Sequence, residues 1–222
     1  FAEPEQYLEK LDLFSELKSL PAEKTEKIML YGVAETLKRQ RVELNPKLKE
    51  YIESAEYGYP WSFVANDYRR YDFLPFNAWR ILPKEQQALF NNCQIGNKSN
   101  TKFRIPRVFP ITRELVELLG LYAAEGTTIT SAGRTSRVVF SFGSHEAELI
   151  EYTKNLLKKV FNYITEPHYA HETATTIQID SLIVSLLFRE IFKAGASSHI
   201  KRVPYLIFNS SRALRERYLI AY

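Results

Sequence analysis

Apolar and polar positions along the chain follow two different patterns, and the change between them lies near residue 106. In the first part, apolar side chains recur at helical spacing between polar breaks, a pattern that predicts a mostly helical region. The expected helices cover residues 8–20, 21–41 and 45–55, with two more after Trp61 and after Pro83. Residues 91–100 are polar and include a glycine, so we expect a loop or linker there.

From Thr112 onward, helical segments alternate with pairs of strand-like segments. Thr112 is a good N-cap for a helix at Arg113–Glu125, and Gly126 suits the end of that helix. Ser144 and Ser181 are expected to cap the two helices that follow them. The expected strands are 127–130, 137–142, 164–169 and 175–179, and the expected helices after the first are 145–161, 182–192 and 212–222. The order αββαββα mixes antiparallel hairpins with helices, so the predicted class is α+β.

The two patterns divide the chain into two expected domains. A length of 222 residues fits one large domain or two small ones. We assign residues 1–105 to an N-terminal, mostly helical accessory region and residues 106–222 to the α+β region.

Composition excludes several classes of protein. With 45% hydrophobic residues, 14 Phe and 14 Tyr, the chain is not intrinsically disordered. Cys93 is its only cysteine, which excludes a disulfide scaffold and suits a reducing, intracellular location. No apolar run reaches the roughly 18 residues of a membrane span, so no membrane partner is expected. The first residue is Phe and no secretory signal follows it, so we expect the chain to be a piece of a longer protein.

Charge is balanced overall but unevenly distributed. The chain carries 30 Lys+Arg against 26 Asp+Glu, a net charge of +4. Residues 98–113 and 127–143 contain basic side chains and no acid, and residues 193–217 contain a single acid, Glu216. Basic stretches interleaved with hydroxyl and aromatic residues suit a polyanion such as nucleic acid. Charge alone, however, favours an ordinary solvated surface.

The helix expected at Arg113–Glu125 has an unusual second half. That half is apolar on nearly all sides and contains Gly120, which costs about 1 kcal/mol relative to alanine within a helix. Gly120, Ala123 and Ala124 would allow the backbone of another helix to approach closely. Glu125 opposes the helix dipole, which suggests that a cation lies beside it. A buried helix that ends in a surface glutamate is the simpler alternative.

Residues 118–126, Leu-Leu-Gly-Leu-Tyr-Ala-Ala-Glu-Gly, resemble the LAGLIDADG motif of homing endonucleases, in the DOD-type, archaeal form that inteins carry. Three later segments are similar to the same family. They are Ser141–Glu146 where a hairpin meets a helix, Lys201-Arg202-Val203-Pro204, and Tyr218–Tyr222, which resembles the opening of a second motif. The resemblance covers about residues 106–222 and is specific because the motif, the element order and the later segments agree.

The resemblance implies a fold and an activity. The fold would be the αββαββα half of a LAGLIDADG homing endonuclease, which cuts double-stranded DNA at one specific site by metal-dependent phosphodiester hydrolysis. Glu125, with Gly126, would hold a divalent metal such as Mg²⁺, and Lys201 would act on a water molecule or on the transition-state phosphate. Gly120, Ala123 and Ala124 would face the second LAGLIDADG half, supplied by the same parent chain. The family more often has Asp where this chain has Glu125.

The resemblance also implies that the sheet covers the major groove of DNA. Alternation groups Thr128 and Thr130 with Arg137, Val139 and Ser141, subject to the register of the turn. The expected DNA-binding residues are Thr128, Thr130, Arg134, Arg137, Ser141, His168, Gln178 and Arg202. Arginine can recognise guanine in that groove and glutamine can recognise adenine. Each of these residues has the alternative of a plain solvent-facing side chain.

Two aromatic and basic segments of the accessory region, residues 68–71 and 76–80, are further candidates for DNA recognition. Such segments are more often core residues with arginines that reach the surface, and we favour that interpretation for Trp79.

A second class of function stays open at this point. A DNA- or RNA-binding protein, such as a regulator or a maturase, can use the same scaffold without cutting. Retention of Glu125 and Lys201 favours the endonuclease. Protein splicing itself is not expected of this piece, because residue 1 is Phe rather than a nucleophile and the last residue is Tyr222 rather than Asn.

Overall fold

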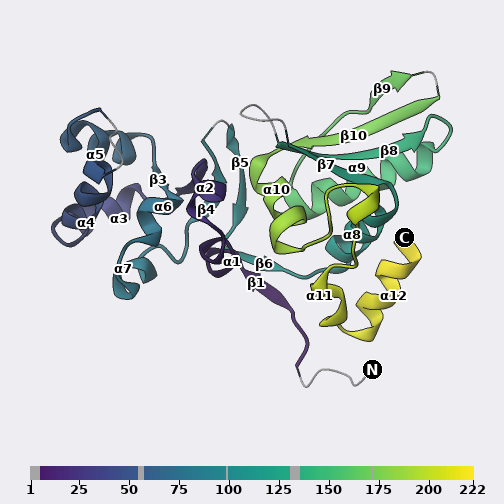
Figure 1. Ribbon diagram of the computed structural model, residues 1–222, viewed down its shortest axis with the longest axis horizontal. Helices are drawn as coiled ribbons and strands as arrows, with labels where there is room; N and C mark the ends of the chain where they lie inside the picture. The colour runs from purple at the N-terminus through teal and green to yellow at the C-terminus, as the bar shows by residue number, and fades with distance from the viewer. Residues whose placement is uncertain (1–5, 55–57, 99, 131–135, 172) are drawn as a thin grey trace. The chain divides into compact units, whose positions relative to one another are not determined.

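The computed structural model describes residues 6–54, 58–98, 100–130, 136–171 and 173–222. Helices and antiparallel sheets occur together, which confirms the α+β class (Figure 1). The chain divides into two compact units, one spanning Asp12–Val108 and the other combining the residues up to Leu11 with Phe109–Tyr222. The sequence-based division after residue 105 lies close to the second boundary, but the residues up to Leu11 group with the later unit.

Backbone pairing explains that grouping. Strand β1 (Lys10–Asp12) pairs with β6 (Val108–Pro110) in a two-stranded sheet. Just outside these strands, the amide of Ile111 donates to the carbonyl of Glu9 at 2.8 Å, and the amide of Leu8 donates to the carbonyl of Asn209 at 2.8 Å. Residues 8–11 are therefore held by residues that come much later in the chain.

The later unit follows the predicted order of elements. Its elements are α8 (Arg113–Glu125), β7 (Gly126–Thr130), β8 (Ser136–Gly143), α9 (Ala147–Phe161), β9 (His168–His171), β10 (Ala174–Asp180), α10 (Leu182–Leu186), a π-helical turn η1 (Leu187–Ile191), a 3₁₀ turn η2 (Ser198–Ile200), α11 (Tyr205–Phe208) and α12 (Arg212–Ala221). Thr112 caps α8 as expected, since its hydroxyl accepts a hydrogen bond from the amide of Leu115. Ser181 likewise caps α10. The αββαββα order from Thr112 is confirmed.

The sheet of this unit has the strand order β7-β8-β10-β9, with every neighbouring pair antiparallel. Alternation gives it one core face, where Val138, Phe140, Ile177 and Ile179 are fully buried. Helices α8, α9 and α10 contact the sheet, and Figure 1 shows α9 running alongside the strands. The opposite face carries polar side chains.

Two predicted boundaries in this unit are wrong. Helix α9 starts at Ala147 with Glu146 as its N-cap, rather than being capped by Ser144. A tight turn precedes the helix, because the amide of Glu146 donates to the carbonyl of Gly143 at 3.0 Å and the Glu146 carboxylate accepts from the Gly143 amide at 2.6 Å. The strand expected at 164–169 begins only at His168, since left-handed Asn162 (φ 51°) ends α9 and an irregular segment follows.

The Asp12–Val108 unit contains a sheet that the periodicity did not reveal. Its strands are β2 (Ile28–Tyr31), β3 (Phe73–Pro75), β4 (Gln94–Asn97) and β5 (Asn100–Pro106), in the order β3-β2-β4-β5. The helix expected across residues 28–31 and the loop expected at 91–100 are therefore wrong. The mostly helical description of the accessory region holds only for the remainder. Its helices are α1 (Leu13–Ser19), α2 (Ala22–Thr25), α3 (Ala34–Arg39), α4 (Arg41–Ser54), α5 (Trp61–Arg70), α6 (Phe76–Arg80) and α7 (Lys84–Ala88).

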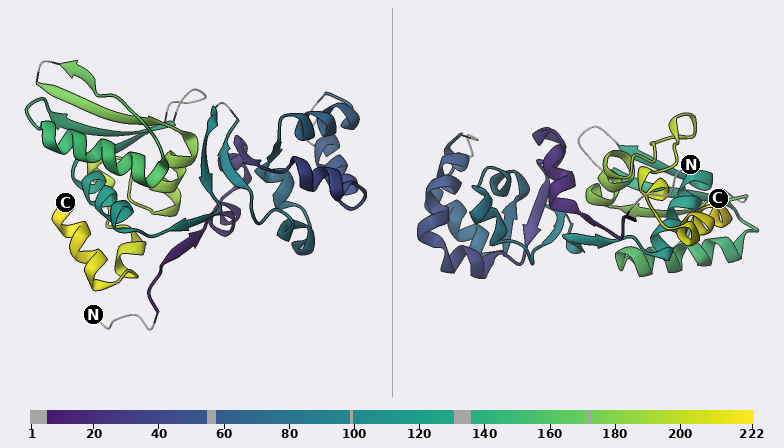
Figure 2. Two further views of the ribbon diagram at one scale, coloured as in Figure 1. Left: turned by 180° about the vertical axis from the view of Figure 1, so that it is seen from behind. Right: turned by 90° about the horizontal axis from the view of Figure 1, so that it is seen from below.

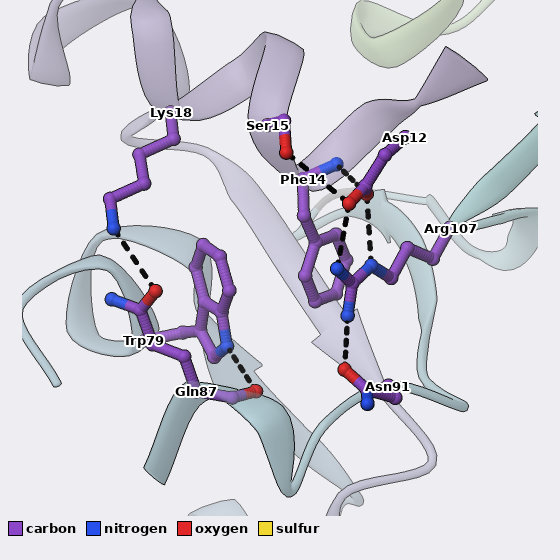
Figure 3. A network of polar contacts seen from close by, with 8 residues as sticks. All are labelled: Asp12, Phe14, Ser15, Lys18, Trp79, Gln87, Asn91 and Arg107. Atoms are coloured by element: carbon purple, nitrogen blue, oxygen red, sulfur yellow. Dashed lines mark hydrogen bonds and ion pairs between the residues drawn. The ribbon is translucent and has the colours of Figure 1, made fainter. Parts of the chain in front are cut away.

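A polar network fastens the start and the end of this unit together (Figure 3). Arg107, beyond β5, donates to both carboxylate oxygens of Asp12, at 2.9 and 2.7 Å. The hydrogen bond and charge of Arg107 hold the pKa of Asp12 below its usual value, although burial opposes the shift. The Arg107 guanidinium also lies over the ring of Phe14, at 4.7 Å from its centroid. Among the described residues, no helix is long and apolar enough to cross a membrane.

Candidate functional site

Glu125 and Gly126 mark the junction where α8 ends and β7 begins. The Glu125 side chain is exposed, and none of the hydrogen bonds within the described residues uses its carboxylate. The amide of Gly126 donates to the carbonyl of Tyr122. A Cβ atom on Gly126 would lie 2.3 Å from the Tyr122 ring and 2.7 Å from its Cα, so only glycine fits here. The carboxylate is thus presented to solvent from a junction of fixed geometry.

Lys201 lies beside this junction. Its ammonium group donates to the carbonyl of Ala124 at 3.1 Å and stands 5.8 Å from the centroid of the Tyr122 ring. Burial lowers the pKa of Lys201 below its usual value, while the charge of Glu125 opposes that shift. The structure therefore brings Glu125 and Lys201 together and supplies the cation that an acid at a helix C-terminus suggests. Their chemical roles stay predictions.

Helix α12 packs against α8 at Gly120, and the two helices lie side by side in the views of Figure 1 and Figure 2. A Cβ atom on Gly120 would lie 2.5 Å from the carbonyl oxygen of Tyr218 and 2.9 Å from Cβ of Ala221. The backbone of α12 therefore lies directly against Gly120. Ala123 and Ala124 are half-buried, and their part in the helix interface stays a prediction.

A buried carboxylate, which the sequence analysis missed, also connects the helices of this unit. Glu117 in α8 is only 5% exposed and accepts hydrogen bonds from Arg113 at 2.7 Å and from the Tyr152 hydroxyl at 2.7 Å. Arg217 of α12 lies 4.0 Å away. The Arg113–Glu117 spacing of four residues was the only local signal for this network. Its effect is to hold α8, α9 and α12 together.

The register of the first hairpin corrects the predicted set of DNA-facing residues. Thr128 pairs with Val138 and Thr130 with Ser136, whereas Thr127 and Ile129 pair with Val139 and Arg137. Because paired residues share a face, grouping Thr128 and Thr130 with Arg137 is wrong, and Thr127 and Ile129 take their places. Thr128 is buried with its hydroxyl 2.7 Å from the Tyr122 hydroxyl. Thr130 is exposed and accepts a hydrogen bond from Arg189 at 2.5 Å.

A row of hydrogen-bonded polar side chains crosses the open face of the sheet. Arg137 is 3.0 Å from the carboxylate of Asp180, and it donates to the side-chain carbonyl of Gln178 at 3.2 Å. The amide nitrogen of Gln178 lies 2.8 Å from Nε2 of His168. Since Arg137 can only donate, the Gln178 side-chain carbonyl accepts from it and the Gln178 NH₂ group is left to face His168. The three predicted residues Arg137, Gln178 and His168 thus form one hydrogen-bonded network with Asp180. The sequence analysis missed Asp180.

The other predicted DNA-binding residues are placed as follows. Ser141 is exposed and pairs with Thr176 on the same open face as Gln178. Arg202 is exposed, and its amide donates to the carbonyl of Ala194 at 3.0 Å. Arg134 lies outside the described residues. Donors and acceptors are mixed along this face, which suits hydrogen bonding to base edges.

No family model matches the chain. Two known proteins are similar to it, however. An alignment of 225 residues, 99% of this chain, is 29% identical to a DNA polymerase II large subunit of Thermococcus kodakarensis and covers 11% of that protein. An alignment of 180 residues, 78% of this chain, is 30% identical to an uncharacterized protein of Methanocaldococcus jannaschii and covers 18% of it. The chain therefore corresponds to a small segment of each relative.

Candidate metal ligands do not form a cluster of three in the described part of the chain. There, no three His, Cys, Asp or Glu side chains gather closely enough to hold a metal ion. Glu125 provides one exposed carboxylate, of the oxygen type that Mg²⁺ prefers. A divalent metal at this point would need further ligands from beyond these residues.

The aromatic and basic segments of the Asp12–Val108 unit separate into core and surface. Tyr68, Phe76 and Trp79 are buried, which confirms the core interpretation of Trp79. Arg80 is also structural, because it donates to the carbonyls of Lys18 and Leu20, each at 2.5 Å. Of the remaining residues, Arg69 is half-buried and Arg70 and Tyr71 are exposed. With exposed Lys38 and Phe63 they make up a basic and aromatic surface, which also contains the acid Asp67.

Proposed function

We propose that the chain is part of a LAGLIDADG homing endonuclease carried by an intein, and that it takes part in site-specific cutting of double-stranded DNA. The observation that carries this proposal is the pair of helices α8 and α12, in contact at Gly120, with Glu125 and Lys201 together at the end of α8. The αββαββα order and the open polar sheet face support it as well.

The similarity to the polymerase subunit fits this proposal. An inserted intein would explain why an alignment covers 99% of this chain but only 11% of a DNA polymerase II large subunit. The matched segment would then be a passenger of its host protein and would have no part in DNA synthesis.

Glu125 and the carbonyl of Gly126 would supply oxygen ligands to Mg²⁺. Bound Mg²⁺ supplies electrostatic stabilisation of the charge that develops on a phosphodiester during hydrolysis. The second carboxylate would come from the second LAGLIDADG half. Lys201 would place its ammonium group, oriented by the Ala124 carbonyl, where it attracts a phosphate oxygen or polarises water.

DNA recognition would fall to the open face of the sheet. The Arg137–Gln178–His168 row presents side chains that are already oriented by one another and by Asp180. Pre-oriented polar groups lose less conformational entropy on binding than free side chains do. The basic and aromatic surface of the Asp12–Val108 unit would add contacts to phosphates.

A cleavage assay tests the proposal. The substrate is a plasmid that carries the coding sequence of a DNA polymerase II large subunit without the inserted segment, and the enzyme is the complete parent protein. We expect one double-strand cut in Mg²⁺, none in EDTA and none with Glu125→Gln, while specific binding persists. Glu114→Gln is the matched control, since Glu114 lies at the other end of α8 and should leave cutting intact.

The outcomes separate the two classes of function. Specific binding without cutting by the wild-type protein would favour a non-cleaving DNA- or RNA-binding protein. Normal cutting by Glu125→Gln would remove Glu125 from the metal site. The isolated chain should bind DNA weakly and should not cut it. Its affinity for DNA should fall as the salt concentration rises.

A further inference from the structure

The segment around residues 193–202, which carries Lys201, folds back on itself and is fastened to the α8–β7 junction. The amide of Arg202 donates to the carbonyl of Ala194 at 3.0 Å, which closes the segment into a loop. The carbonyl of Ala196 accepts from the Thr128 amide at 2.9 Å and from the Thr127 hydroxyl at 2.8 Å. These bonds attach the middle of the loop to the first residues of β7.

Tyr122 attaches the same loop to the last turn of α8. Its side chain is fully buried, and its hydroxyl donates to the carbonyl of Gly195 at 2.6 Å. That single proton is then used, so the Thr128 hydroxyl, 2.7 Å away, must be the donor to Tyr122. Burial raises the pKa of Tyr122, which keeps the hydroxyl protonated and able to donate.

Gly195 transmits this attachment to Lys201. Its φ of +82° is a conformation that side chains rarely adopt, and a Cβ atom there would lie 2.2 Å from the carbonyl oxygen of Ile200 and 2.8 Å from Cα of Lys201. Gly195 therefore packs directly on the backbone of Ile200 and Lys201. The Tyr122 hydroxyl thus contacts Gly195, and Gly195 contacts Lys201, whose ammonium group binds the Ala124 carbonyl at the end of α8.

We infer that Tyr122 and Gly195 are positioning residues, which hold the Lys201 ammonium group at the Ala124 carbonyl beside Glu125. Neither side chain reaches solvent as a reacting group would, because Tyr122 is buried and Gly195 has none. The inference rests on the proposed function only as far as Lys201 serves the cutting reaction. The fastening of the loop can be measured without any cutting.

The first experiment measures hydrogen exchange and NMR spectra of this chain as the Tyr122→Phe variant, which keeps the ring and removes the hydroxyl. We expect faster exchange at the amides of Thr128 and Arg202, and a Lys201 side-chain signal that moves toward the position of solvent-exposed lysines. Tyr152→Phe is the matched control. It removes a tyrosine hydroxyl and its hydrogen bond to Glu117 in the same unit, whereas Tyr122→Phe loses two hydrogen bonds, and it should leave these signals unchanged.

The second experiment measures single-turnover cutting and DNA affinity in the complete endonuclease. Misplacing a reacting group costs rate far more than affinity, so Tyr122→Phe should cut about tenfold more slowly or worse while its Kd for DNA barely changes. Gly195→Ala, which pushes on Lys201 directly, should show the same division between rate and affinity. Tyr152→Phe should change neither quantity beyond its effect on stability.

The outcomes distinguish this inference from the proposed function. Unchanged exchange and an unchanged Lys201 signal in Tyr122→Phe would overturn the positioning role. An altered loop with a normal cutting rate would overturn it too. If the loop responds as expected but the wild-type parent cuts no DNA, the fastening of Lys201 stands and the endonuclease proposal fails.

Discussion

Gly120→Ala reverses the usual effect of replacing a helical glycine. In an isolated helix, alanine is about 1 kcal/mol more favourable than glycine. In this protein the added methyl group would lie 2.5 Å from the Tyr218 carbonyl oxygen and 2.9 Å from Cβ of Ala221, closer than such atoms approach in proteins. Both atoms belong to helix α12, so the contact can be relieved only by moving one helix away from the other.

The magnitude follows from these two opposing terms. Overpacking costs about 1–3 kcal/mol, and a clash with a helix backbone belongs to the upper part of that range because a carbonyl cannot rotate away. After the gain of about 1 kcal/mol in helix propensity, we expect a net loss of about 1–2 kcal/mol. Gly120→Leu should lose more, and in the parent enzyme it should abolish metal-dependent cutting before DNA binding.

Thermal and urea unfolding with two probes measure this loss. The 2 tryptophans of the chain, Trp61 and Trp79, both lie in the Asp12–Val108 unit, so their fluorescence is an internal control for that unit. Hydrogen exchange at amides of α8 and α12 reports on the other unit. Adding Ala221→Gly removes one of the clashing atoms and should restore part of the stability. A Gly120→Ala protein that is more stable by about 1 kcal/mol would refute the helix-contact model.

Three further predictions concern titratable groups. Burial raises the pKa values of Tyr152 and Tyr218 to about 12. Their contribution to stability is therefore present below about pH 10 and is lost as the pH rises toward 12. In urea unfolding at increasing pH, Tyr152→Phe should reduce the loss of stability between about pH 10 and 12. Arg107 holds the pKa of Asp12 below its usual value, so the contribution of this carboxylate to stability is present above about pH 4 and is lost as the pH falls. Asp12→Asn should therefore reduce the loss of stability at acid pH, measured by tryptophan fluorescence. Burial raises the pKa of Cys93 to about 11. A thiol reagent at neutral pH should therefore label Cys93 only as fast as the Asp12–Val108 unit unfolds. Rapid labelling of the folded protein would contradict this burial.

The sequence predicted the later unit well because its signals are local. Thr112 and Gly126 bound α8 through capping chemistry, and alternation identified the two strands that follow it. Hairpin register is not a local property, however. Which residues of β7 share a face with Arg137 depends on the pairing register of β7 and β8, and a difference of one residue moves Thr128 from the open face to the core.

The sheet of the Asp12–Val108 unit shows a different limit. All four residues of β2 are buried, so Ile28–Tyr31 has no alternation, and a short continuous apolar run cannot be distinguished from part of a buried helix. Strand β4 is short and contains Gly96, whose missing side chain leaves room for the ring of Tyr31 and the carbonyl of Phe103. Its polar composition resembled a loop because the packing that requires glycine comes from distant residues.

Helix α8 contains two residues that are unfavourable on local grounds, and both are explained by partners far along the chain. Gly120 weakens the helix, but it permits the close approach of α12 near Tyr218. Glu125 opposes the helix dipole, but it lies beside the charge of Lys201. Sequences that fold well agree with their structure at each local position except where another requirement overrides it. Two such exceptions in one helix, one at its contact with a second helix and one at its exposed end, are what a shared helix interface with a charged site at its tip requires.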